Sequence, residues 1–200
     1  LAPFIVTFAT MTIFRGATLV YTNGNPITKG LSDTFLFQFL GQGYIVGIPF
    51  PVIIMFIVFI VLYVLLHKTA FGKSVYAIGG NEKAAYISGV KLNKVKIIIY
   101  SISGIMASIS GLIITSRLSS AQPTAGASYE MDAIAAVVLG GTSLSGGKGR
   151  ILGTLIGALI IGVLNNGLNI IGVSAFWQQV VKGVVILIAV LIDRFKVVKQ

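Results

Sequence analysis

The sequence alternates between long apolar stretches and short charged segments. A helix that crosses the hydrocarbon core of a bilayer, about 30 Å thick, needs about 20 mainly apolar residues. Stretches of roughly this length predict five membrane spans, at residues 3–21, 51–66, 97–116, 151–171 and 176–192. The last span contains Lys182, and in the fourth Gly153 and Gly157 form a GxxxG step that indicates a close helix contact. That contact is ordinary packing between helices, an interface with a second copy of the chain, or an interface that moves during function.

Two further apolar stretches are interrupted by glycine or proline. Residues 31–47 come before the second span and predict a short helical or re-entrant piece at the membrane surface. Residues 133–146 (AIAAVVLGGTSLSG) are apolar but short and rich in glycine. This second segment is either a half-helix that ends inside the membrane or a thin full crossing.

The composition indicates a membrane protein rather than a soluble one. Of the 200 residues, 56% are hydrophobic and 10% are charged, whereas soluble domains carry about 45–50% apolar and about 25% charged residues. The chain therefore has too few charges to cover a globular surface. The predicted fold class is an all-α polytopic membrane protein, with a single transmembrane domain over residues 1–200.

The distribution of charge predicts the orientation of the spans. Fifteen basic residues against five acidic ones give a net charge of +10, and most of the basic residues lie in the loop 68–96, at Lys148 and Arg150, and in the tail 194–199. Because cytoplasmic loops are rich in Lys and Arg, we expect these three regions on the cytoplasmic side. That arrangement requires about six crossings, one of them short or broken, and a cytoplasmic C-terminus. The basic residues are not interleaved with aromatic ones as in nucleic acid-binding modules, so no nucleic acid partner is expected.

The sequence offers little material for catalysis. With five acidic residues, one histidine and no cysteine, it predicts no catalytic residue set, no metal site and no cofactor. The glycine-rich stretch from Gly140 to Arg150 is superficially similar to a phosphate-binding loop, which reads G-x-x-x-x-G-K-[ST]. Here Thr142 stands at the first required glycine, and Gly149 follows the lysine where Ser or Thr is needed. We therefore expect the chain itself not to hydrolyse ATP and not to be an enzyme.

A short helix is predicted inside the basic loop 68–96. Asn81 is a favourable N-cap, Glu82 suits the positive end of the helix dipole, and Gly89 is a favourable residue just after the helix. A helix this short is marginal alone in water, so it is either a passive helix held by its own lipid or a docking segment for a cytoplasmic partner. The residues predicted to dock are Asn81, Glu82, Ala84, Ala85, Ser88 and Gly89.

The same segment carries a resemblance to a known family. Residues 82–89 read E-x-A-A-x-x-x-G, similar to the E-A-A-x-x-x-G coupling-loop signature of ABC importer permeases, with one extra residue after the Glu and no proline further on. Residues 21–27 (YTNGNPI), 77–90 (AIGGNEKAAYISGV) and 117–169 resemble the ribose/xylose/galactose permease family of bacterial ABC sugar importers, and above all its ribose permeases. The resemblance covers essentially the whole chain.

The resemblance implies a homodimeric permease in the bacterial inner membrane. A cytoplasmic ABC ATPase subunit would dock on each copy, and a periplasmic sugar-binding protein would deliver ribose or a similar monosaccharide. Residues 81–89 would be the coupling helix, with Ala84 and Ala85 as its contact face. Permeases of this family have about ten spans, so roughly the first third would be absent from this sequence.

Polar groups inside predicted spans suggest a translocation path, because they are costly in a membrane. Broken or amide-bearing positions suited to a hydroxyl-rich sugar are Gly140, Gly141, Thr142, Asn165 and Asn166. The last span offers Gln178 and Gln179 as further candidates. Each asparagine is alternatively a hydrogen-bonding contact between helices. An ion-coupled secondary sugar transporter is the alternative function, but it requires a membrane-embedded acid, and no predicted span has one in its interior. A membrane-anchored structural protein, the third possibility, leaves the predicted docking helix unexplained.

Overall fold

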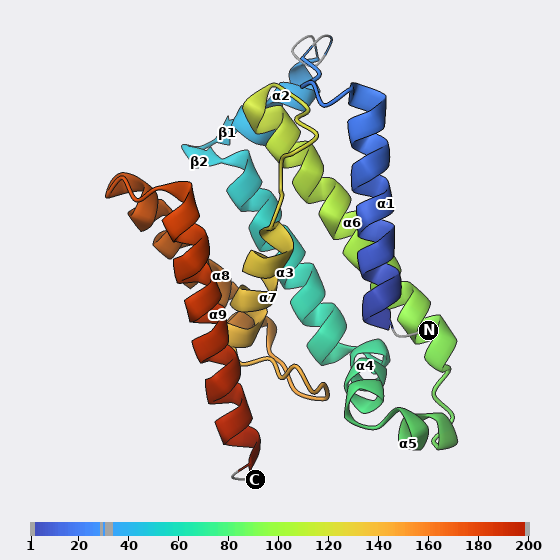
Figure 1. The fold of residues 1–200 in the computed structure, drawn as a ribbon. Helices are drawn as coiled ribbons and strands as arrows, with labels where there is room; N and C mark the ends of the chain where they lie inside the picture. The colour runs from blue at the N-terminus through green and yellow to red at the C-terminus, as the bar shows by residue number, and fades with distance from the viewer. Residues whose placement is uncertain (1–2, 29, 31–33, 199–200) are drawn as a thin grey trace. The chain divides into compact units, whose positions relative to one another are not determined.

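The computed structural model describes residues 3–28, 30 and 34–198. Lys199 of the predicted basic tail and the first residues of the predicted 31–47 piece lie outside the described part of the chain. The elements, in chain order and as labelled in Figure 1, are α1 (Pro3–Thr22), α2 (Phe35–Gln42), β1 (Tyr44–Ile45), β2 (Ile48–Pro49), α3 (Phe50–Lys68), α4 (Ala70–Gly80), α5 (Glu82–Ile87), α6 (Leu92–Leu118), α7 (Tyr129–Leu139), α8 (Ile151–Ile170) and α9 (Ala175–Val198).

Four helices in the described part of the chain are long and apolar enough to cross a membrane. They are α1, α3, α6 and α8, which coincide with the first four predicted spans. The fifth predicted span is also helical, in the 24-residue α9. The short segment 133–146 is helical only up to Leu139, as the second part of the 11-residue α7, which begins at Tyr129. That helix is about 16 Å long at 1.5 Å per residue, or about half the hydrocarbon core. This length favours a half-helix over a full crossing, and the count of about six crossings stays a prediction.

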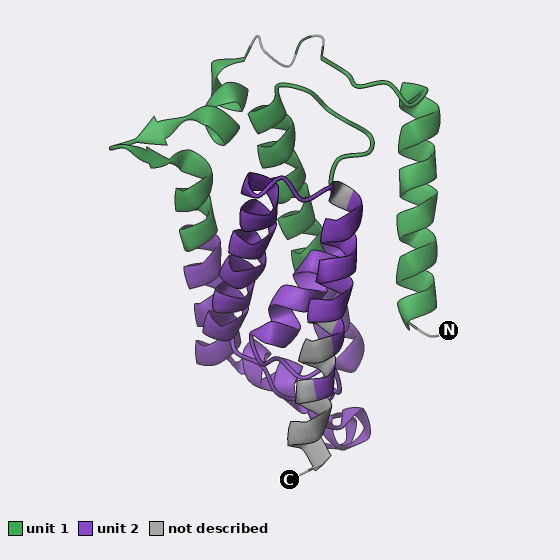
Figure 2. Ribbon diagram, turned by 60° about the vertical axis from the view of Figure 1, so that its left-hand side comes forward, with its two compact units in different colours: residues 1–56, 102–127 green, residues 57–101, 128–200 purple. Residues whose placement is uncertain are grey.

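The chain divides into two compact units (Figure 2), each described here by itself. Unit 1 contains residues 1–56 and 102–127, and unit 2 contains residues 57–101 and 128–200. The chain passes between them within α3, within α6 and again just before α7. The single transmembrane domain over residues 1–200 stays a prediction.

In unit 1, α2 is anchored to the C-terminal end of α6. The buried Ser116 hydroxyl donates a hydrogen bond to the carbonyl of Phe37, and the Gln42 amide donates to the Ser116 carbonyl at 3.1 Å and to the Ser119 hydroxyl at 3.0 Å. Over residues 34–47, which the structure describes, the predicted piece 31–47 is therefore helical only in α2. It continues into a two-stranded hairpin, β1–β2, that the all-α prediction missed.

The residues in the turn of the β1–β2 hairpin explain why the sequence did not predict it. Both central residues, Val46 and Gly47, have positive φ, of 51° and 78°, as a type I′ turn requires. Valine is unusual at such a position because a β-branched residue is strained there. The turn itself carries Val46-Gly47 and not the Asn-Gly or Asp-Gly pair that usually signals a hairpin.

In unit 2, α7 packs against both α8 and α9. A small apolar cluster of Ala135, Ala136 and Ile161 is buried, and Leu139 and Val185 pack around it. The contact between α7 and α8 is backbone to backbone, because a Cβ at Gly157 would lie 2.9 Å from the carbonyl carbon of Ala136 and closer still to its oxygen. Gly153 meets Gly140 in the same way. The predicted GxxxG contact is confirmed, and within this chain its partner is α7.

Candidate functional site

The predicted docking helix is present as α5, and its two ends are closed as the sequence indicates. The Asn81 side chain accepts a hydrogen bond from the Ala84 amide at 3.0 Å, which is an N-cap. At the other end Gly89 adopts a φ of +83°. The Gly89 amide donates to the Tyr86 carbonyl at 2.9 Å, and the Val90 amide donates to the Ala85 carbonyl at 3.0 Å. This pair of bonds is a Schellman motif, so the sequence itself fixes both ends of the helix.

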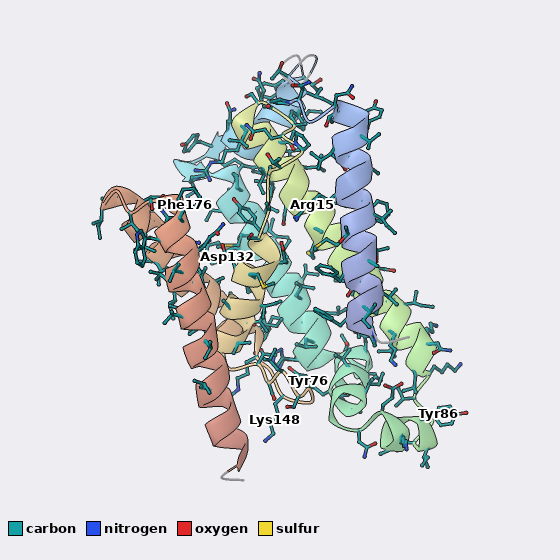
Figure 3. The ribbon with its side chains drawn as sticks, in the orientation of Figure 1. Arg15, Tyr76, Tyr86, Asp132, Lys148 and Phe176 are labelled. Atoms are coloured by element: carbon teal, nitrogen blue, oxygen red, sulfur yellow. The ribbon has the colours of Figure 1, made fainter. Side chains whose placement is uncertain are left out.

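The face that α5 exposes differs from the predicted one. Ala84 is exposed, but Ala85 is only 4% exposed and packs inside the chain, so the prediction that both alanines form the contact face is wrong for Ala85. The side chains of Tyr86 and Ile87 are exposed instead, Ile87 at 84%. Figure 3 shows Tyr86 projecting away from the helix. The available contact surface of α5 is therefore an aromatic and aliphatic one flanked by small residues.

The remaining predicted docking residues lie on the exposed side of this helix. Glu82, Ser88 and Gly89 are all exposed. Glu82 forms an ion pair with Lys96 at 2.6 Å, between side chains that are about half exposed. An ion pair in such a position contributes about 0–1 kcal/mol, so it orients the loop more than it stabilises it.

The loop that carries α5 contacts the glycine-rich loop that follows α7. The Tyr76 hydroxyl on α4 donates to the Gly149 carbonyl at 2.8 Å. The backbone of Gly79 lies so near Gly146 and Gly147 that a Cβ at Gly79 would come within 2.7 Å of the Gly147 nitrogen. Two of the three predicted basic regions, 68–96 and 148–150, therefore lie together in unit 2, as their assignment to one membrane side requires.

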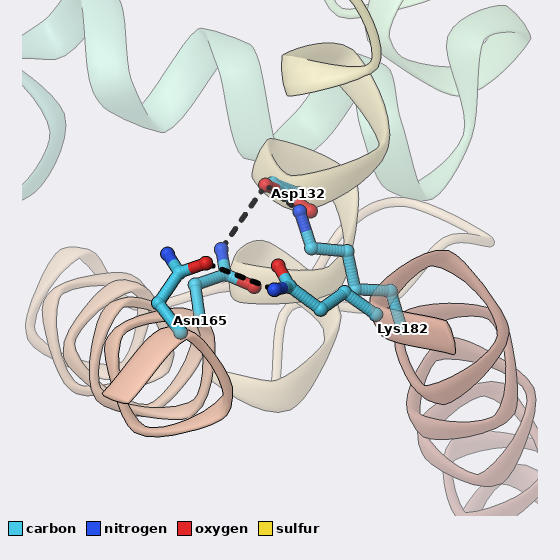
Figure 4. A network of polar contacts seen from close by, with 5 residues as sticks. Asp132, Asn165 and Lys182 are labelled. Atoms are coloured by element: carbon cyan, nitrogen blue, oxygen red, sulfur yellow. Dashed lines mark hydrogen bonds and ion pairs between the residues drawn. The ribbon is translucent and has the colours of Figure 1, made fainter. Parts of the chain in front are cut away.

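A second group of polar residues forms a cavity between α7, α8 and α9 (Figure 4). The Lys182 ammonium forms an ion pair with Asp132 Oδ2 at 2.8 Å, and their side chains are 24% and 18% exposed. The Asn165 amide donates to the same carboxylate oxygen at 3.3 Å. Next to them the Gln178 amide donates to Asn169 Oδ1 at 2.9 Å. One helix thus supplies the acid, a second the asparagines and a third the glutamine and the lysine.

The cavity has a volume of about 490 Å³. Its polar lining is formed by the side chains just described, together with Tyr129. The rest of its wall is small or aliphatic, formed by Ala133, Ala136, Ala158, Ile161 and Gly162. Asn165 Oδ1 is buried and has no hydrogen-bond partner among the described residues, an arrangement that is rare in a folded protein unless a ligand or water completes it.

The structure does not bring the five predicted path residues together. Asn165 lines the cavity, whereas Asn166 is exposed and not part of its lining. Gly140 serves the tight contact with α8, Gly141 forms the turn after α7 with a φ of +81°, and Thr142 lies against Gly149. Of these five residues only Asn165 lines the cavity, and a translocation path through all five stays a prediction.

Sequence reasoning missed the pairing of Asp132 with Lys182. In the sequence Asp132 stands at the start of the short glycine-rich segment and Lys182 inside the last predicted span. The available signal was the single charge of Lys182 within an apolar span, where an unpaired charge is costly and calls for a partner from another helix. Among the described residues no group of three or more potential ligands could hold a metal ion.

The family model and the relatives that match this chain all describe permease components of transport systems. Residues 1–190 match the family described as branched-chain amino acid transport system / permease component. The chain is 68% identical over 196 residues to the ribose import permease protein of Bacillus subtilis (strain 168), covering 98% of this chain and 61% of that protein. It is 58% identical over 193 residues to the ribose import permease protein of Haemophilus influenzae (strain ATCC 51907 / DSM 11121 / KW20 / Rd), with coverages of 96% and 60%.

A more distant relative has another sugar in its name. The D-allose transport system permease protein of Escherichia coli (strain K12) is 44% identical over 194 residues, which are 97% of this chain and 59% of that protein. The chain thus spans about 60% of the length of the curated relatives it matches. No solved structure matches it.

Proposed function

The chain belongs to the family of branched-chain amino acid transport system permease components, and on that premise we propose that it is the C-terminal part of the membrane-spanning permease of an ABC importer for ribose or a similar monosaccharide. The observation that carries this proposal is the near-complete alignment with ribose import permeases, which includes polar and glycine-rich loops that hydrophobicity alone does not produce. In this role the chain forms the passage. The hydrolysis of ATP belongs to a separate subunit.

The proposed assembly has three kinds of protein partner. A cytoplasmic ATPase docks on α5, through the exposed Tyr86 and Ile87 together with Ala84. A periplasmic sugar-binding protein delivers the sugar, and a second permease copy completes the passage. The protein is a multi-pass protein of the bacterial inner membrane with a cytoplasmic C-terminus. The contact between the two basic loops supports a common side for them, and the excess of lysine and arginine there supports the cytoplasmic one.

The ion-coupled carrier is less well supported. Such a transporter needs an acid in the membrane that can bind and release an ion. Asp132 is the acid nearest to this description, but it already forms an ion pair with Lys182 at 2.8 Å. A carboxylate neutralised in this way is poorly suited to binding a coupling cation.

A cross-linking experiment tests the coupling role of α5. Ile87→Cys is introduced as the single cysteine of the full-length permease and paired in membranes with a single cysteine in the candidate ATPase. We expect a disulfide whose yield responds to ATP. The matched control is Ala85→Cys on the same helix, which should not cross-link because that side chain is buried. The absence of a cross-link from both Ile87→Cys and Tyr86→Cys in an assembled complex would overturn the coupling assignment.

A further inference from the structure

The polar cavity between α7, α8 and α9 is chemically unlike the apolar helices around it. We propose that this cavity is a sugar-binding site within the permease, at which Asp132, Asn165, Gln178 and Lys182 hydrogen-bond to the hydroxyl groups of the transported monosaccharide. The inference rests on the proposed function and deepens it, because it assigns to specific side chains a contact with the sugar that neither the family nor the relatives' names supply.

The first reason to expect a ligand is the free energy that it costs to shield this polar cluster from water. An ion pair shielded from water loses most of the solvation of both charges, and a pair of well-packed apolar side chains is often as stable or more so. In helices that face lipid, isolated polar side chains are rarer still and mark sites of function. Asp132, Asn165, Asn169, Gln178 and Lys182 come from three different helices and meet in one place (Figure 4).

The cluster leaves hydrogen-bonding capacity unused. Both contacts that Asp132 makes among the described residues use Oδ2, so Oδ1 remains an acceptor. Lys182 has three donors and uses one of them on Asp132. Gln178 donates through Nε2 to Asn169 and to the Val173 carbonyl. The amide oxygen of Gln178 is thus left to accept a hydrogen bond. A sugar hydroxyl both donates and accepts, so it matches a wall that offers both kinds of group.

Asn165 gives the most specific indication. Its amide nitrogen is held by Asp132, so its oxygen has a defined direction, and that oxygen is buried without a donor. A buried acceptor left unsatisfied costs about 1–3 kcal/mol. A hydroxyl group of a sugar in the cavity would supply the missing donor.

The charge of the cavity lining and the volume of the cavity indicate the class of ligand. Asp132 and Lys182 cancel one another, and Tyr129, Asn165, Asn169 and Gln178 are uncharged, so the lining attracts neither an anion nor a cation. The volume of about 490 Å³ falls within the range of about 300–1,000 Å³ that is usual for small-molecule sites. A neutral, hydroxyl-rich molecule of monosaccharide size is the ligand that fits both properties.

Sugar binding is measured without transport, by protection of a cysteine in the cavity. Ala133→Cys, which lines the cavity, is placed as the single cysteine in the full-length permease and labelled with a small water-soluble thiol reagent. We expect excess ribose to slow the labelling. Asn165→Ala should raise the ribose concentration needed for half-maximal protection about three- to tenfold, because one hydrogen bond to the ligand corresponds to about that factor. Leu144→Cys is the control, since it is exposed but lies outside the cavity lining.

Transport is measured separately in proteoliposomes that contain the permease, its ATPase and the sugar-binding protein. Gln178→Ala should lower the ribose moved per ATP about three- to tenfold while ATP hydrolysis stimulated by the binding protein persists. Gln179→Ala is the matched control, because its side chain is exposed and absent from the cavity lining. Wild-type ribose per ATP in Gln178→Ala, or an equal loss in Gln179→Ala, would refute the site.

The two measurements separate the two claims. Protection by ribose without any ATP-driven uptake would support the sugar site and refute the proposed function. ATP-driven uptake with no protection of Ala133→Cys, and with Asn165→Ala transporting normally, would support the importer and refute the site.

Discussion

Replacement of Gly157 by alanine tests whether α7 and α8 are held together through their backbones. In the present structure a Cβ at this position would lie 2.9 Å from the carbonyl carbon of Ala136 and 3.0 Å from the Gly140 nitrogen, and closer still to the Ala136 oxygen. Ordinary van der Waals contact begins at 3.4 Å. The obstacle is backbone rather than a flexible side chain, so the two helices would have to move apart to admit the added carbon.

The expected magnitude follows from the packing around this point. Insertion of a methyl group into a well-packed contact costs about 1–3 kcal/mol, and here it would also loosen the buried cluster of Ala135, Ala136 and Ile161. Gly167→Ala on the same helix provides the matched control, because no atom lies within 4 Å of its added Cβ. That change should stabilise α8 by about 0.5–1 kcal/mol, since alanine is the better helix former. Both variants share this gain in helix propensity, so they should differ by about the 1–3 kcal/mol of the packing cost alone.

The measurement is thermal unfolding of the full-length permease in detergent, with both variants purified in parallel. Gly157→Ala should unfold several degrees below the wild type, and Gly167→Ala at or above it. An equal transition temperature for Gly157→Ala and the wild type would refute the backbone contact. A Gly167→Ala variant as unstable as Gly157→Ala would mean that α8 tolerates no added methyl group, whatever its neighbours.

The remaining predictions concern the docking helix and the ion pair. Asn81→Ala should cost about 1 kcal/mol by removing the N-cap and should speed hydrogen exchange in α5, with Asn81→Asp restoring protection. Maleimide should label Ala84→Cys about an order of magnitude faster than Ala85→Cys, which is reached only by local opening; similar rates would mean that Ala85 is not buried. Asp132→Asn should destabilise the permease more than Asp132→Asn combined with Lys182→Gln, because a single replacement leaves a shielded charge unpaired; equal unfolding temperatures would contradict the pairing.

Features that depend on neighbours in the sequence could be predicted from it. The limits of α5 follow from Asn81 and Gly89, whose side chain and backbone act within a few residues of their own position. The long helices follow from apolar length alone. The two basic loops were assigned to one membrane side by charge counting, and their contact through Tyr76 and Gly149 agrees with that assignment.

Features that depend on how helices pair could not be predicted in the same way. Whether Ala85 faces a partner or its own chain depends on the packing of α4 and α5, which no local pattern encodes. The hairpin at Val46 and Gly47 uses a valine where the turn favours glycine or asparagine. The polar path was sought in broken or amide-bearing segments, whereas most of the cavity's polar lining comes from positions on separate helices that become neighbours only when α7 reaches both α8 and α9.

One property of α7 and α8 accounts for both the tight contact and the cavity. Where glycine faces backbone, at Gly153 and Gly157, the two helices approach as closely as their main chains permit. Farther round the same helices the side chains are again small, at Ala133, Ala158 and Gly162, but there they face the long side chains of α9 instead of backbone. Lys182 and Gln178 cross that space to reach Asp132 and Asn169 without filling it. Substitution of a larger side chain at Gly162 would therefore reduce the volume open to a sugar and leave the helix contact intact, whereas the same change at Gly157 would separate the helices.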